Sequence, residues 1–101
     1  MIDIVKSKNG IKIRITEERW FHITENHDDI AGFYDDILDC IENPDIIIKG
    51  YNDALVALKL FSDNKYLASV YKETSEEDGF IITAYFTSKL KLEKEEIIWK
   101  K

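Results

Sequence analysis

The feature that most constrains the fold is a run of four strand-like segments after the only proline, Pro44. Short connections join them, and these contain turn-forming residues such as Asn52-Asp53 and Ser75–Gly79. A parallel return needs a crossover of about a dozen residues or more, so the spacing predicts a four-stranded antiparallel sheet. The segments are rich in β-branched and aromatic residues, and they are Asp45–Tyr51, Ala54–Phe61, Tyr66–Lys72 and Phe80–Thr87.

Two further strand-like segments open the chain. Isoleucines alternate with polar residues over about residues 2–6 and 11–15, and Asn9-Gly10 lies between them. An Asn-Gly pair readily adopts the positive φ angles of a tight turn, so this stretch predicts a hairpin. After residue 88 we expect a loop or short helix, and then Ile97–Trp99 docked as an edge strand.

The segment between the hairpin and Pro44 has helical signals. Thr16 is a suitable N-cap and acidic residues follow it, whereas the residues from Asn26 to Asp29 favour a helix end. A second helix is expected from about Asp29, because apolar residues recur at helical spacing. These residues are Ile30, Phe33, Tyr34, Ile37, Leu38 and Ile41.

Together these segments predict one α+β domain over residues 1–101. It consists of an N-terminal hairpin and two helices packed on one face of a four-stranded antiparallel β-sheet. The single cysteine, Cys40, excludes an internal disulfide and fits a reducing, cytoplasmic setting. No signal segment opens the chain, and no apolar run approaches the roughly 18 residues of a membrane span, so no membrane contact is expected.

The charge is unevenly distributed along the chain. Residues 16–45 hold ten acids and one base, a balance of −9, whereas the remainder holds 13 bases and ten acids, a balance of +3. The net charge of −6 disfavours broad, non-specific binding to nucleic acid or anionic membranes. An anionic ligand is therefore expected to meet the second half of the chain, while the acidic part is either a solvated helix face or a mimic of nucleic acid.

Both histidines fall in one short stretch, at positions 22 and 27. Helical zinc pairs are spaced i, i+4, but a spacing of five turns the two rings about 140° apart on an intact helix. Neither a metal nor another cofactor is therefore expected. His22 is expected on the solvent face. His27 either packs beside Trp20 or lies in a loop after Asn26.

Metal-free RNA cleavage needs a base for the 2′-hydroxyl, an acid for the 5′-oxygen and a cation or hydroxyl for the phosphate. The histidines could supply the acid and base, and alternation puts Thr83 and Tyr85 on one strand face. Lys59 interrupts an apolar strand, and the cations of Arg19 and Lys72 are expected to bind substrate. Each of these residues also has an ordinary structural explanation, such as β-propensity, packing or a solvated strand edge.

Several motifs follow one another over about residues 11–99. They are Thr16-Glu17-Glu18-Arg19-Trp20, His22-Ile23, His27, Asn43-Pro44-Asp45, Lys59, Tyr66-Leu67, Phe80–Tyr85 and Ile98-Trp99. This order resembles the phage-associated branch of the barnase/EndoU/colicin/RelE-like nuclease fold. The resemblance implies a small, toxin-like RNase domain that works without metal. By position, it implies catalytic roles for His22, His27, Lys59, Thr83 and Tyr85.

Two functions from different classes remain open. The first is a metal-independent endoribonuclease of toxin, phage or mobile-element type, with RNA as substrate and an inhibitor or antitoxin protein as partner. The second is a non-catalytic protein-interaction domain on the same fold, which uses its acidic helices or an edge strand. Convergence of the histidines with Lys59, Thr83 and Tyr85 in one cleft would favour the nuclease. The oligomeric state is open.

Overall fold

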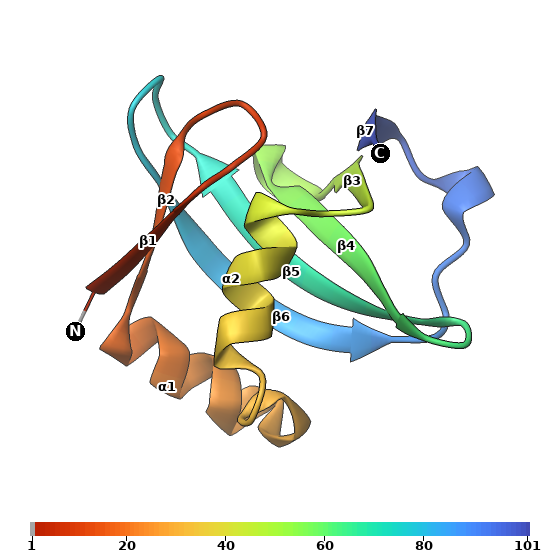
Figure 1. Ribbon diagram of the computed structural model, residues 1–101, viewed down its shortest axis with the longest axis horizontal. Coiled ribbons are helices and arrows are strands. Elements are labelled where there is room, and N and C mark those ends of the chain that lie inside the picture. Colours follow the sequence, from red (N-terminus) through yellow and green to blue (C-terminus); the bar gives the residue numbers. More distant parts are fainter. Residues whose placement is uncertain (1) are drawn as a thin grey trace.

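The computed structural model describes residues 2–101, which form one mixed seven-stranded sheet and two α-helices (Figure 1). The strands are β1 (Ile2–Lys6), β2 (Lys12–Thr16), β3 (Ile46–Lys49), β4 (Leu55–Ser62), β5 (Lys65–Glu73), β6 (Gly79–Thr87) and β7 (Ile97–Lys100). The helices are α1 (Glu17–Asn26) and α2 (Tyr34–Glu42), with short 3₁₀ turns η1 (Asp28–Ile30), η2 (Tyr51–Asp53) and η3 (Leu92–Lys94). No helix in residues 2–101 is long and apolar enough to span a membrane.

The prediction of a four-stranded antiparallel sheet is wrong, because the sheet has seven strands and is mixed. The predicted α+β class is confirmed. The sheet order is β1-β2-β6-β5-β4-β3-β7, so the hairpin and the tail strand extend the four central strands on both sides. β2 runs parallel to β6, with Ile13 beside Gly79 and Arg14 beside Phe80. The prediction considered only connections between neighbouring segments. Two helices and three strands separate β2 from β6, so no short turn in the sequence indicates that they pair.

Most local predictions are confirmed. The hairpin forms, α1 ends at Asn26, and the Thr16 hydroxyl accepts a 3.1 Å hydrogen bond from the backbone N–H of Arg19 at the start of α1. β7 is the expected edge strand, paired with β3. The second helix starts later than predicted, at Tyr34, because Asp28–Ile30 form a separate 3₁₀ turn.

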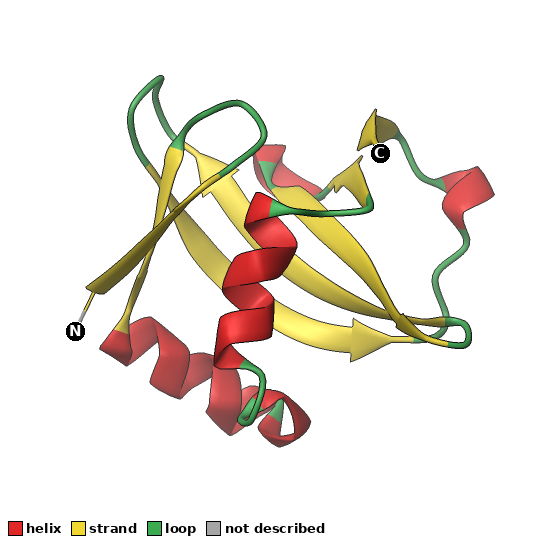
Figure 2. Ribbon diagram, viewed as in Figure 1, coloured by secondary structure: helices red, strands yellow, loops and turns green. Residues whose placement is uncertain are grey.

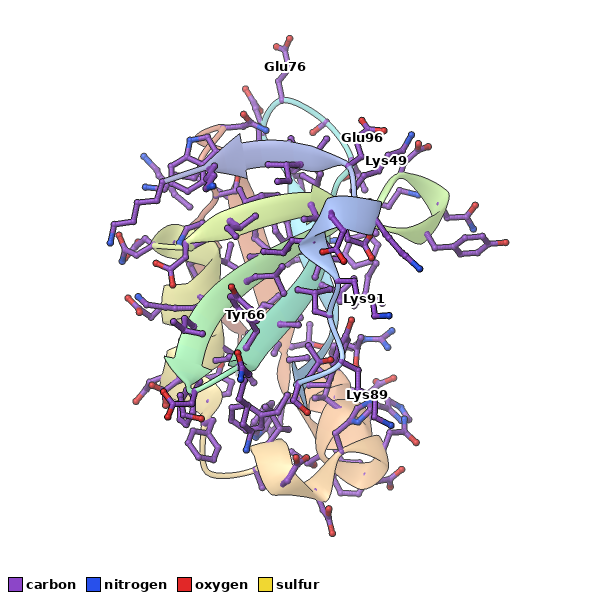
Figure 3. All side chains as sticks on the ribbon, turned by 90° about the vertical axis from the view of Figure 1, so that its right-hand side faces the viewer. Lys49, Tyr66, Glu76, Lys89, Lys91 and Glu96 are labelled. Carbon is purple, nitrogen blue, oxygen red and sulfur yellow. The ribbon has the colours of Figure 1, made fainter. Side chains whose placement is uncertain are left out.

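Both faces of the sheet are covered. α2 crosses one face, and α1 lies at its end beside β2 and β6 (Figure 2). The fully buried side chains of Ile13, Ile37 and Tyr71 form part of the core on this face. The opposite face carries a smaller apolar cluster, against which Leu90 and Leu92 pack. We call residues 88–96, which cross this second face between β6 and β7, the C-terminal strap (Figure 3).

Gly79 marks the place where β2, β5 and β6 meet. A Cβ at this position would collide with the carbonyl oxygen of Lys72 and would lie 2.7 Å from Cδ1 of Ile13. We therefore expect Gly79→Ala to lower the free energy of unfolding by about 1–3 kcal/mol in urea denaturation. Gly32→Ala is the control, because a Cβ added at Gly32 would have no neighbouring atom within 4 Å. Equal stability of the two variants would contradict the close contact of Gly79 with Lys72 and Ile13.

Candidate functional site

The candidate site lies along the second half of β6, where this strand parts from β2. β2 pairs with only the first two residues of β6, and α1 and η1 pack beside the rest. The cross-strand neighbours of Thr83 and Tyr85 are Val70 and Ala68, which both belong to the smaller apolar cluster. Thr83 and Tyr85 therefore face the strap side of the sheet, with Cα atoms roughly 7 Å apart.

A shallow hollow of about 210 Å³ between α1 and β6 brings together Arg19, His22 and Thr83. We call it the polar hollow. Nη1 of Arg19 donates a 3.5 Å hydrogen bond to the carbonyl of Ile82, which ties the guanidinium to β6. His22 is exposed, as predicted, and its Nε2 lies 4.0 Å from a carboxylate oxygen of Glu18. The polar hollow thus offers a cation, an imidazole and a hydroxyl to one ligand.

His27 lies just beyond this hollow, directly after the end of α1. Its ring packs against Tyr85, with the ring centroids 5.9 Å apart and the planes inclined by 38°. Trp20 packs instead on Tyr34, with centroids 4.9 Å apart. Of the two placements open to His27, the structure therefore shows the one after the helix end at Asn26.

Burial is the main reason that the pKa of Tyr85 is raised, and the nearby carboxylate of Glu95 raises it further. The phenol therefore keeps its proton at neutral pH. It can donate a hydrogen bond there, but it is poorly suited to act as a base.

The two lysines lie apart from this group. Lys59 pairs with Leu67, and Leu67 pairs with Phe86, so Lys59 projects to the sheet face opposite Tyr85. There its Nζ lies 2.7 Å from Oδ2 of Asp39 on α2. This hydrogen bond raises the pKa of Lys59 and lowers that of Asp39.

Lys72 is in register with Phe80, near the other end of β6 from Tyr85. Five of the seven predicted site residues thus come together around the second half of β6, and the two lysines do not join them. The catalytic role of Lys59 stays a prediction of the resemblance. The five residues are Arg19, His22, His27, Thr83 and Tyr85.

Sequence reasoning did not select three residues that contribute to this region. Asn26 and Ile82 line the polar hollow, and Glu95 of the strap adjoins Tyr85. Ile82 lies at a register shift between β5 and β6, which no local pattern indicates. For Asn26, the sequence indicated only that a helix could end there. In residues 2–101, no three histidine, cysteine or carboxylate side chains are grouped so as to hold a metal ion.

No family model matches the chain, and no curated protein or solved structure matches it significantly. The function has therefore to be inferred from the side chains around β6.

Cys40 lies outside the site, on the side of α2 that faces the sheet. It is fully buried, its Sγ donates to the carbonyl of Ala57 at 3.3 Å, and burial raises the pKa of the thiol to about 12. The prediction that it is a core residue is confirmed. We expect native protein to resist iodoacetamide at mildly alkaline pH and denatured protein to react fully, as measured by intact-mass spectrometry. Rapid labelling of native protein would contradict the packing of α2.

Proposed function

We propose that this protein is a metal-independent endoribonuclease whose substrate phosphate binds over the second half of β6. The observation that carries the proposal is the placement of two imidazoles beside neighbouring positions of one strand face. His22 shares the polar hollow with Thr83, and His27 packs on Tyr85. These strand positions are roughly 7 Å apart, and we infer that a single phosphodiester lies between the two imidazoles.

The reaction is a transesterification within the RNA strand. One imidazole takes the proton of the 2′-hydroxyl, whose oxygen then attacks the adjacent phosphorus. The bond from phosphorus to the 5′-oxygen breaks, and the second imidazole gives that oxygen a proton. The products are a 2′,3′-cyclic phosphate and a 5′-hydroxyl end.

The other polar groups would act on the phosphate and on the histidines. The guanidinium of Arg19 and the hydroxyl of Thr83 would bind the non-bridging oxygens, whose negative charge increases in the transition state. Since Arg19 also bonds to the Ile82 carbonyl, its guanidinium is held against β6 before substrate arrives. The protonated phenol of Tyr85 supports the ring of His27.

The test compares one oligonucleotide sequence made as RNA and as DNA, incubated with the purified protein in excess chelator. We expect the RNA to be cut to fragments that end in a 2′,3′-cyclic phosphate, identified by mass spectrometry. The DNA should stay intact because it lacks the attacking hydroxyl. Cleavage of both strands, or cleavage that needs added metal, would contradict the proposal.

The edge strand β7 favours a second candidate, the protein-interaction domain. Ile97 and Ile98 in this strand are 45% and 46% exposed. Exposed apolar residues on an edge strand are suited to pairing with a strand of another chain. Self-association in light scattering that is lost in Ile97→Lys, combined with no RNA cleavage, would favour this function over the nuclease.

A further inference from the structure

A cavity of about 610 Å³ lies between the sheet and the C-terminal strap. The strap crosses the sheet face opposite α2 (Figure 3). Its size falls within the range of about 300–1,000 Å³ that is common for small-molecule sites. Strands β3 to β6 supply one wall, and Leu90 and Glu95 of the strap supply another. We call this space the strap cavity.

The walls of the strap cavity suit a flat ring with a polar edge. Val56, Val70, Ile82 and Leu90 give it apolar surfaces, and the ring of Tyr85 adds an aromatic one. Three polar residues contribute to the same lining, namely Lys49, Asn52 and Glu95. Unpaired nucleobases are bound in this way, through apolar or aromatic contact with their faces and hydrogen bonds to their edges.

The strap cavity also adjoins the site on β6. Ile82 lines both the strap cavity and the polar hollow, and Tyr85 lines the cavity while it contacts His27. We therefore expect a ligand whose ring fills the cavity to reach Arg19, His22 and Thr83 with its next polar group. A nucleotide has this order of groups, since its base is joined through ribose to a phosphate.

We propose that the strap cavity binds the nucleobase next to the scissile phosphate, so that the substrate is held by its base as well as by its backbone. This inference rests on the proposed ribonuclease function. It makes Leu90 a positioning residue, because Leu90 lines the strap cavity but not the polar hollow. It also explains how an acidic protein can bind RNA, since stacking supplies affinity that a net charge of −6 does not.

The first experiment maps binding on the wild-type protein by methyl and amide NMR. The probes are the four nucleoside 3′-monophosphates and inorganic phosphate. We expect at least one nucleotide to shift the signals of Val56, Val70 and Leu90, whereas inorganic phosphate shifts only those around Arg19 and Thr83. If no nucleotide moves a cavity signal at saturation, the inference is overturned.

The second experiment fills the cavity. Leu90 and Leu92 both pack on the smaller apolar cluster, but only Leu90 lines the strap cavity, so Leu92→Trp is a matched control for Leu90→Trp. We expect Leu90→Trp to weaken nucleotide binding and to lower the rate of RNA cleavage about 10- to 100-fold, in line with the loss of one stacked base. Leu92→Trp should bind nucleotides and cleave RNA as the wild-type protein does. Circular dichroism checks that each variant is folded. If a variant does not fold, the NMR titration of the wild-type protein still tests the inference.

The outcomes separate the two proposals. RNA cleavage that is equally fast in Leu90→Trp and wild type would overturn the base site and leave the nuclease standing. Nucleotide binding in the cavity without any RNA cleavage would overturn the nuclease and support the cavity as a nucleotide site. If the wild-type protein neither binds a nucleotide in the cavity nor cleaves RNA, both the base site and the nuclease function would be overturned.

Discussion

Replacing His22 by alanine is expected to lower kcat/KM for RNA cleavage by about 10²–10⁴-fold, the usual contribution of one acid or base. The residue is half exposed, and its polar contact is a 4.0 Å approach to Glu18 on the same helix. Its removal should therefore change the free energy of unfolding by no more than about 0.5 kcal/mol. A loss of activity in this variant would then reflect chemistry and not unfolding.

The measurement uses initial rates on an RNA oligonucleotide in chelator, with thermal unfolding followed in parallel. Glu25→Ala is the matched control, because Glu25 is exposed on the same helix but does not line the polar hollow. We expect this control to cleave RNA at the wild-type rate. Full activity in His22→Ala would remove His22 from the acid–base pair and would contradict the proposed mechanism.

The largest effect on stability is expected for Ile13→Ala, which should lower the free energy of unfolding by about 2–5 kcal/mol. Ile13 has no exposed surface, and it lies opposite Val5 of β1 and beside Gly79 of β6. Domains of this kind have a total stability of about 5–15 kcal/mol, so the loss would be a large share of it.

Urea denaturation of Ile13→Ala and Ile4→Ala provides the comparison. Ile4 belongs to the same hairpin but is 59% exposed, so its truncation should change stability by no more than about 0.5 kcal/mol. Similar, small losses in both variants would mean that the hairpin lies outside the core.

The difference between what could and could not be predicted follows from the range of the interactions. The Thr16 cap and the Asn9-Gly10 turn depend on residues a few positions away, so their types are sufficient to predict them. The pairing of β2 with β6 depends on residues far apart in the chain, and no neighbouring residue encodes it.

The site shows the same division. Thr83 and Tyr85 share a face because they lie two apart on one strand, which the sequence alone predicts. The position of Lys59 relative to Thr83 and Tyr85 depends on the register across three strands, β4, β5 and β6. That register shifts between Leu60 and Ser62 in β4 and between Val70 and Tyr71 in β5. Composition and spacing therefore identify the polar residues of the chain but do not determine which sheet face a residue on another strand occupies.

The parallel pairing of β2 with β6 also affects the order in which the domain can form. Ile13 and Gly79 are 66 positions apart, so the hairpin cannot join the sheet until β6 exists to receive it. Closing so long a loop costs entropy before any contact compensates for it, and such non-local contacts slow folding. The local meander β4-β5-β6 has no such requirement and should assemble earlier. The groups that line the polar hollow, which come from α1 and from β6, would thus be brought together only in the last stage of folding.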